Sequence, residues 1–200
     1  MSATLRYSKF SPFVRKVLVF ASEAGLRDTI TLEPADVWAA DTDIAKDNPL
    51  GKIPALRTPD GTFTSSFACC DWLDQQHGGE ALIPRRGPER WRVMQLHGLA
   101  DGAMEAAVFI VNETLRRPKE FVWSGAIERQ RGKLLGGMEA LEARTGELAP
   151  VDLASITTGC LLGYLDLRHK DLDWRGRVPK LRAFYESFAS RPSMEATKPE

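Results

Sequence analysis

A serine followed by a proline, Ser11-Pro12, stands where an extended stretch gives way to an amphipathic helical pattern. Serine is favoured at the N-cap and proline at the first helical position, so this pair is a common helix opening. The same hydroxyl can accept a hydrogen bond from a backbone N–H and donate its own proton to an anion at the positive end of the helix. Ser11 is therefore a candidate for a helix cap and for an anion-binding group, with Tyr7 and Ser8 as neighbouring hydroxyl alternatives.

Three further features follow Ser11 along the chain. Lys52 precedes the pair Ile53-Pro54. Most X-Pro bonds are trans, so the plain explanation of Pro54 is a loop proline at the start of a strand. Ser66 opens a helical pattern and by itself is an ordinary N-cap. Each residue has a plain structural explanation, so a binding role for any of them needs more than its local sequence.

The cysteines and histidines form no metal or redox motif. Cys69 and Cys70 are adjacent, Cys160 is distant, and no CxxC occurs, which argues against a zinc knuckle or a dithiol site. The histidines are scattered without ligand spacing: His77, His97 and His169. We therefore expect no metal, small cysteines in the core, and a reducing, cytoplasmic location.

The elements that must position these residues follow from periodicity and turn signals. The N-terminal half predicts six elements in this order: a strand at 4–8, a helix at 13–24, a strand at 29–33, a short helical turn within 40–51, a hairpin at 54–66 and a helix at 66–77. The hairpin turns at Pro59-Asp60-Gly61, and Gly78-Gly79 ends the last helix. This compact mixed order is that of thioredoxin-like folds.

A connector rich in proline, glycine and charge, residues 80–87, separates this half from a stretch without comparable strand signals. Long helical patterns cover the ranges 88–116, 119–144, 152–169 and 178–190. We predict a mixed domain at 1–79, a linker at 80–87 and an all-helical domain at 88–200.

Composition, net charge and hydropathy argue against several classes of protein. Lysine plus arginine equals aspartate plus glutamate, 27 each in 200 residues, so no overall field favours nucleic acid or an anionic membrane. The sequence contains no run of about 18 apolar residues, the length needed to cross a bilayer, and no signal peptide is evident. Disorder is expected only in the closing "SMEATKPE".

Three stretches, "FSPFVRKV", "NPLGKIPAL" and "TSSFACCDWLD", occur at the spacing seen in the N-terminal domain of glutathione transferases. The second half agrees through "ADG", "DLASITTGCLLGYLDLR" and the closing "RPS". The chain resembles a bacterial glutathione transferase of the Ser/Cys type, in a subgroup with "SPFVRK" and "GYLDxR" signatures, over nearly its whole length. The resemblance implies a thioredoxin-like domain, an all-helical domain, a homodimer and a role in detoxification.

The resemblance also assigns roles within the site. Ser11 matches the family's active-site serine or cysteine, which holds the glutathione thiolate. Ile53, before a cis Pro54, would present its backbone to the cysteinyl part of glutathione, and Lys52 could pair with the glycine carboxylate. The start of the helix at Ser66 would receive the γ-glutamyl carboxylate, which is anion binding at a helix N-terminus.

Two departures from the family pattern are visible. An acid usually precedes the helix-opening serine and helps to place the γ-glutamyl amine, but this chain has Ser65. The capping box before the third long helix has its residue types exchanged, Asp152 and Ser155, so we expect a weaker return bond from the serine. Asp101 could supply a carboxylate from a partner subunit, although a solvated or interface charge explains it equally well.

These implications predict a cytosolic glutathione transferase that attacks a small hydrophobic electrophile. The pocket for that electrophile would be lined by apolar residues that are equally plain core residues: Phe10, Phe13, Met104 and Val108. A thiol-exchange enzyme is disfavoured, because relatives of that kind carry cysteine where this chain has Ser11. A rival is an isomerase that returns glutathione unchanged, but members of that branch typically carry an "SSC" motif, which "KFSPF" does not match. The alternative that stays open is a non-catalytic binding or regulatory protein on the same fold.

Overall fold

The computed structural model describes residues 2–199 and contains two compact units. The first comprises Met1–Arg85 with Arg191–Glu200, and the second comprises Arg86–Ser190. A four-stranded sheet with helices forms the first, and helices form the second, which confirms the predicted fold class. The boundaries 79/80 and 87/88 remain a prediction, since compactness alone does not show where independently folding domains end.

The sheet has the strand order β2-β1-β3-β4. β1 pairs in parallel with β2 and antiparallel with β3, and β3 pairs antiparallel with β4. Leu5 lies opposite Leu56 at its centre, and neither side chain is exposed. Gly61, with φ +117°, closes the predicted hairpin in a conformation that favours glycine. The strands span Ala3–Tyr7 (β1), Ile30–Pro34 (β2), Ala55–Thr58 (β3) and Gly61–Phe63 (β4).

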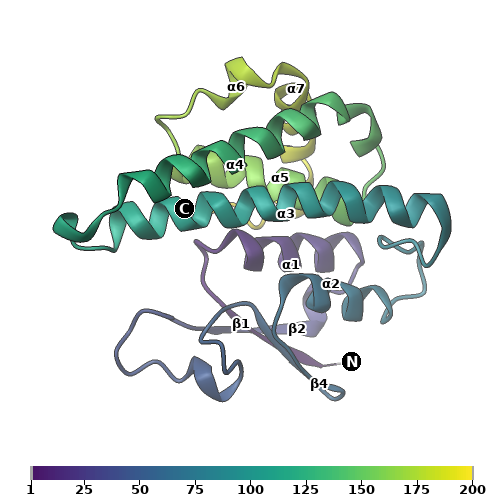
Figure 1. Cartoon of the computed structure of the whole chain (residues 1–200). Helices are drawn as coiled ribbons and strands as arrows, with labels where there is room; N and C mark the ends of the chain where they lie inside the picture. Colours follow the sequence, from purple (N-terminus) through teal and green to yellow (C-terminus); the bar gives the residue numbers. More distant parts are fainter. Residues whose placement is uncertain (1, 200) are drawn as a thin grey trace. The chain divides into compact units, whose positions relative to one another are not determined.

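Two helices, α1 (Pro12–Glu23) and α2 (Ser66–Asp74), pack together on one face of this sheet (Figure 1). Both bury an apolar stripe that includes Phe20 and Leu73, which are fully buried. Two short 3-10 helices lie in the connections, η1 (Arg27–Thr29) and η2 (Ile44–Lys46). The observed order is the one that periodicity predicts.

The expected disorder after residue 192 is wrong for the described part of the tail. Residues Pro192–Glu195 form α8, which packs against α1. The Arg191 guanidinium donates two hydrogen bonds of 2.8 Å to the Glu23 carboxylate, and Arg15 donates to the Met194 carbonyl at 2.9 Å. These partners are far apart in the sequence, so no local pattern could indicate them.

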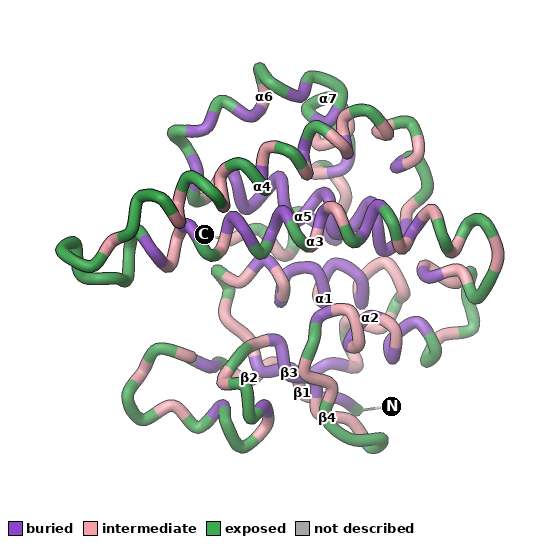
Figure 2. Tube along the Cα trace, viewed as in Figure 1, coloured by how far each residue is buried: buried purple, intermediate pink, exposed green. Residues whose placement is uncertain are grey.

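In the second unit, α3 (Gly87–Leu115) packs against α4 (Ser124–Ala143) and α5 (Leu153–Arg168). α5 is buried along nearly its whole length, and Figure 2 shows it almost continuously in the colour of buried residues. The chain at Pro118 breaks the helical pattern as expected, but α4 begins only at Ser124 after a 3-10 turn. Elements of this unit are α3 (Gly87–Leu115), η3 (Lys119–Phe121), α4 (Ser124–Ala143), η4 (Thr145–Leu148), α5 (Leu153–Arg168), α6 (Trp174–Arg177) and α7 (Pro179–Ala189).

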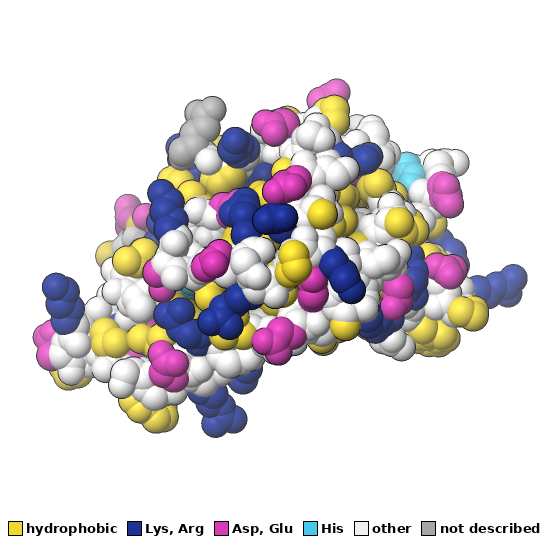
Figure 3. All heavy atoms as spheres, turned by 90° about the horizontal axis from the view of Figure 1, so that it is seen from above, with side chains coloured by type: hydrophobic (Ala, Val, Ile, Leu, Met, Phe, Trp, Pro, Cys, Tyr) yellow, Lys and Arg dark blue, Asp and Glu magenta, His cyan; other side chains and the backbone are white. Residues whose placement is uncertain are grey.

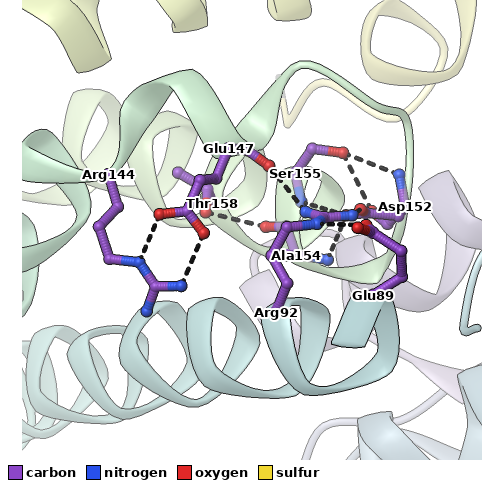
Figure 4. A network of polar contacts seen from close by, with 8 residues as sticks. All are labelled: Glu89, Arg92, Arg144, Glu147, Asp152, Ala154, Ser155 and Thr158. Carbon is purple, nitrogen blue, oxygen red and sulfur yellow. Dashed lines mark hydrogen bonds and ion pairs between the residues drawn. The ribbon is translucent and has the colours of Figure 1, made fainter. Parts of the chain in front are cut away.

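The capping box at the start of α5 is complete despite the exchanged residue types (Figure 4). Asp152 accepts from the N–H groups of Ala154 (2.8 Å) and Ser155 (3.0 Å), while the Ser155 hydroxyl accepts from the Asp152 N–H at 2.9 Å. Arg92 on α3 adds a 2.5 Å bond to the second carboxylate oxygen of Asp152. The predicted weakening at Ser155 is thus compensated by an ion pair between helices.

Basic and acidic side chains are interspersed on the face of the molecule drawn in Figure 3. Ion pairs between such side chains occur in the structure, such as Arg144 with Glu147 at 2.7 Å. Of the helices in residues 2–199, none is both long and apolar enough to pass through a lipid bilayer.

Candidate functional site

Ser11 ends a tight turn and caps α1. Its N–H donates to the Ser8 carbonyl at 3.1 Å, and its Oγ accepts from the Val14 N–H at 3.3 Å. Pro12 occupies the first helical position. The side chain is half-buried, and no acceptor for its hydroxyl proton is found among residues 2–199. The predicted cap is therefore present, and its proton remains available to an anion.

The loop that carries Lys52 and Ile53 is closed by a buried amide. Asn48 has no exposed surface, its Nδ2 donates to the Lys52 carbonyl at 2.7 Å, and its Oδ1 accepts from the Leu50 N–H at 3.0 Å. Gly51 has φ +65°, a conformation that glycine adopts readily. The Ile53-Pro54 peptide bond is cis, the isomer that the resemblance implies.

Ile53 is anchored through its side chain, which packs on a small apolar cluster of Ala35, Ile44 and Ala55. This cluster joins η2 to the sheet. Lys52, in contrast, is exposed. The backbone of Ile53 is thus held by packing on one side and by the Asn48 loop on the other.

A charge cluster fastens the segment before this loop to the sheet. Arg6 on β1 is 3% exposed, and its guanidinium pairs with Asp43 and, at 2.5 Å, with Asp47. The Asp43 carboxylate raises the pKa of Arg6, while Arg6 lowers the pKa of Asp43. Glu33 and Arg57 extend the cluster across β2 and β3. Since Asp47 directly precedes Asn48, the cluster fixes one end of the Lys52–Ile53 loop.

The sequence pattern predicts Ser66 as the N-cap of α2, but the N-cap is Ser65. Ser65 is exposed, and its Oγ accepts from the Ala68 N–H at 3.1 Å. Ser66 is the first helical residue and is buried. The position where the family usually has an acid is thus used here as a cap, which explains why a hydroxyl is structurally sufficient there.

The strand register brings the three predicted binding segments to the same end of the sheet. β1 ends just before the Ser8–Ser11 turn, and β3 begins just after Pro54. Arg6 pairs with Ala55, and Leu56 pairs with Phe63 near the end of β4. The loops bearing Ser11, Ile53 and Ser65 therefore all leave the sheet at one end, as a shared ligand site requires.

The cysteines have a structural role. Cys69, Cys70 and Cys160 form no disulfide among residues 2–199, and all three are fully buried. Burial raises the pKa of the Cys69 thiol to about 12, although the charge of Lys16 opposes this shift. A thiol with that pKa is almost entirely protonated at neutral pH, so Cys69 is not a nucleophile.

Each histidine has a structural partner. His77 lies 3.3 Å from Asp74, His97 lies 3.0 Å from the Thr157 hydroxyl, and His169 lies 3.1 Å from the Ala107 carbonyl. Burial lowers the pKa of His169. Across residues 2–199, no three metal-ligating side chains come close enough to hold an ion.

The residues predicted to line an electrophile pocket differ in exposure. Phe10 is 41% exposed and Phe13 is half-buried, whereas Met104 has no exposed surface and belongs to the helical core. Val108 and Asp101 are half-buried on α3. Of these residues, Phe10 is the one that presents a substantial apolar surface.

Two buried polar residues, Arg6 and Asn48, are not among the residues predicted from the sequence. Asn48 closes the Lys52–Ile53 loop, and Arg6 pairs with Asp47, which directly precedes Asn48. Arg6 lies in a strand pattern and gives no sign of its role. The only available signal for Asn48 was its place in "NPLG", where a side-chain amide commonly stabilises a turn.

Two family models match the chain. Residues 10–76 match the glutathione S-transferase N-terminal domain, and residues 124–187 match the glutathione S-transferase C-terminal domain. The "Uncharacterized GST-like protein YibF" of Escherichia coli (strain K12) is 32% identical over 194 residues, which cover 94% of this chain and 95% of that protein.

Solved structures agree with these matches. A glutathione transferase family member from Pseudomonas fluorescens Pf-5, with bound glutathione, is 43% identical with a TM-score of 0.96 over all of both chains. A second structure from the same organism, with bound S-(propanoic acid)-glutathione, is 42% identical with a TM-score of 0.91, again over all of both chains.

Proposed function

Because this chain belongs to the glutathione S-transferase family, we propose that it activates the thiol of glutathione for attack on a small hydrophobic electrophile. The observation that carries the proposal is the Ser11 hydroxyl, which caps α1 while its proton has no acceptor among residues 2–199. In this role the Ser11 hydroxyl donates a hydrogen bond to the glutathione thiolate and keeps its proton. We also propose that the chain is a Ser-type member of the family, since Ser11 stands where other members have serine or cysteine.

One hydroxyl is energetically sufficient for this task. A free cysteine thiol has a pKa of about 8.5, so lowering it by about 2 units requires roughly 2.7 kcal/mol of preference for the anion. A hydrogen bond to a charged group supplies about 1.5–3 kcal/mol. The N-terminus of α1 adds about 0.3–1 kcal/mol. Together these contributions match the requirement.

The remaining loops would hold the tripeptide. The Ile53 backbone would bind the cysteinyl residue as a one-residue strand addition, before Pro54. Lys52, which is exposed, would pair with the glycine carboxylate. The N-terminus of α2, with Ser65 and Ser66, would receive the γ-glutamyl carboxylate.

The ligands of relatives support this assignment. Glutathione is bound in one relative that is 43% identical, and S-(propanoic acid)-glutathione is bound in another that is 42% identical. We propose that the same tripeptide binds this chain and that its sulfur faces a small hydrophobic electrophile. Phe10, on the turn before Ser11, would provide an apolar wall.

A homodimer is proposed on the basis of an open groove between α3 and α4. Its lining includes Gly98, Gly102 and Gly136, at each of which an added Cβ would meet nothing within 4 Å. Glu105 on α3 and Lys133 on α4 also line the groove, so two copies related by a twofold axis could pair these charges. Sedimentation would show a dimer that Gly102→Leu weakens.

A non-catalytic binding protein is the second candidate, and Ser65 is the observation that favours it. This serine stands where the family's acid helps to place the γ-glutamyl amine, and its hydroxyl already serves as a cap. Weaker glutathione binding would follow.

We also propose a cytoplasmic location, since none of the three cysteines forms a disulfide and disulfides are rare in reducing compartments. A role in detoxification is proposed from membership of the family alone.

Calorimetry with glutathione, followed by conjugation assays with several electrophile classes, tests the proposal. We expect binding and turnover in the wild type, and tighter binding in Ser65→Glu. Binding without turnover of any electrophile would favour the non-catalytic candidate. Absence of binding in both proteins would contradict the glutathione site itself.

A further inference from the structure

Lys9 and Phe10 form the tip of the turn that leads into Ser11. The turn is closed by the 3.1 Å bond from the Ser11 N–H to the Ser8 carbonyl, and the Phe10 N–H lies 3.5 Å from the Ser8 Oγ. Both tip residues are exposed. An exposed cation and an exposed aromatic ring therefore stand two residues and one residue before Ser11 in the chain.

The ammonium group of Lys9 rests over the ring of Phe10, with Nζ 5.3 Å from the ring centroid. This contact orients a side chain that would otherwise be mobile. Among residues 2–199, no carboxylate forms an ion pair with Lys9. Its charge is therefore not neutralised by the fold.

The chain segment that contains the turn is also basic. Between residues 8 and 22 the chain has three cations, Lys9, Arg15 and Lys16, and no acid. Arg15 donates to Met194 and Thr197, and Lys16 is fully buried. Lys9 is thus the cation of this group that a ligand can reach.

We propose that Lys9 binds the carboxylate of the electrophile, so that the substrates are small haloacids or related carboxylates. This inference rests on the proposed function, because Ser11 must place the glutathione sulfur at this turn. The apolar body of the substrate lies against Phe10, and its carboxylate lies at Lys9. Lys9 is a specificity-determining residue and takes no part in activating the thiol.

The reaction balances for a haloacid such as 2-bromopropanoate. The thiolate sulfur forms a bond to carbon 2 with its lone pair, the carbon–bromine bond breaks, and bromide leaves with the bonding electrons. No oxidant or reductant is needed, and the carboxylate is unchanged in the thioether product.

An exposed ion pair is weak and salt-sensitive, so we expect Lys9 to contribute moderately to the affinity for a carboxylate. The test uses calorimetry with two product thioethers of nearly equal shape, S-(1-carboxyethyl)glutathione and its carboxamide analogue, S-(1-carbamoylethyl)glutathione. The proteins are the wild type, Lys9→Gln and Lys9→Arg, with Lys170→Gln as a control. Lys170 is an exposed lysine of the second unit, so its substitution makes the same charge change elsewhere.

We expect the wild type to prefer the carboxylate thioether by about three- to tenfold, at low salt more than at high salt. Lys9→Gln should abolish the preference, whereas Lys9→Arg and Lys170→Gln should retain it. Equal binding of both thioethers by the wild type, or a preference that survives in Lys9→Gln, would overturn the role of Lys9 but leave the proposed function intact. If glutathione itself failed to bind, both would be overturned.

Discussion

The helix N-termini of the two units are built differently. In the first unit, α1 and α2 are each capped by one serine hydroxyl, from Ser11 and Ser65. In the second unit, α5 starts with a reciprocal capping box at Asp152, which also pairs with Arg92 (Figure 4). At the first two ends the capping serine binds one N–H group each, whereas at the third Asp152 binds the N–H groups of both Ala154 and Ser155.

The difference separates binding from folding. A helix N-terminus attracts anions through its unpaired N–H groups, so a complete capping box removes the property that a ligand site needs. Asp152 is 4% exposed and lies beside the most buried helix, where an unpaired donor would be costly. Substitutions should therefore affect stability at Asp152 and ligand binding at the serine caps.

The largest stability effect is expected for Asp152→Ala. This change removes an N-cap, worth about 1 kcal/mol, and leaves the Arg92 charge without its buried partner. We expect a loss of about 2–4 kcal/mol in the free energy of unfolding, measured by urea titration with circular dichroism. Glu89→Gln is the matched control, because Glu89 also pairs with Arg92 but is exposed. An equal effect of both changes would contradict the account.

A smaller effect, shared between stability and binding, is expected for Asn48→Ala. The change removes the two hydrogen bonds that close the Lys52–Ile53 loop, which should cost about 1–3 kcal/mol of stability. Glutathione affinity should fall about tenfold by calorimetry, because the Ile53 backbone is no longer fixed. Asn48→Asp keeps the acceptor for Leu50 but loses the donor to Lys52, so it should weaken binding as well. Unchanged affinity in both variants would show that the loop has no part in binding.

The smallest effect, dependent on pH, is expected for Glu23→Gln in the tail contact. The hydrogen bond from Arg191, with that from Ser193, lowers the pKa of Glu23. A lowered folded pKa means that the stabilisation is present above the unfolded pKa of a glutamate, about 4.3, and is lost as the pH falls through the folded value. The variant should thus be less stable by about 1 kcal/mol at pH 7 and indistinguishable from wild type at strongly acidic pH. A cost that persists at acidic pH would rule out this ion pair as its source.

The sequence indicated the features that depend on neighbouring residues. The Ser11-Pro12 opening, the turn at Pro59-Asp60-Gly61 and the long helical patterns are local signals, and the structure contains each of them. The capping box at Asp152 was visible for the same reason, because its two members are three residues apart.

Features that depend on distant partners were not predictable. Arg6 meets acids 37 and 41 residues away, and Arg191 meets Glu23 across 168 residues. Hydrophobic periodicity carries no information about such pairs. The one-turn helices α6 and α8 were missed because four residues do not establish a period.

The central claim is that Ser11 holds a thiolate in addition to capping α1. The most direct measurement is the ultraviolet thiolate absorbance of bound glutathione against pH, in wild type, Ser11→Ala and Ser65→Ala. Both variants lose one serine N-cap, so a general effect of cap loss appears equally in each. The account predicts that the wild type lowers the thiol pKa by about 1–2 units, that Ser11→Ala reverses this shift, and that Ser65→Ala does not. A thiol pKa that is the same in wild type and Ser11→Ala would contradict it and leave Ser11 as a helix cap alone.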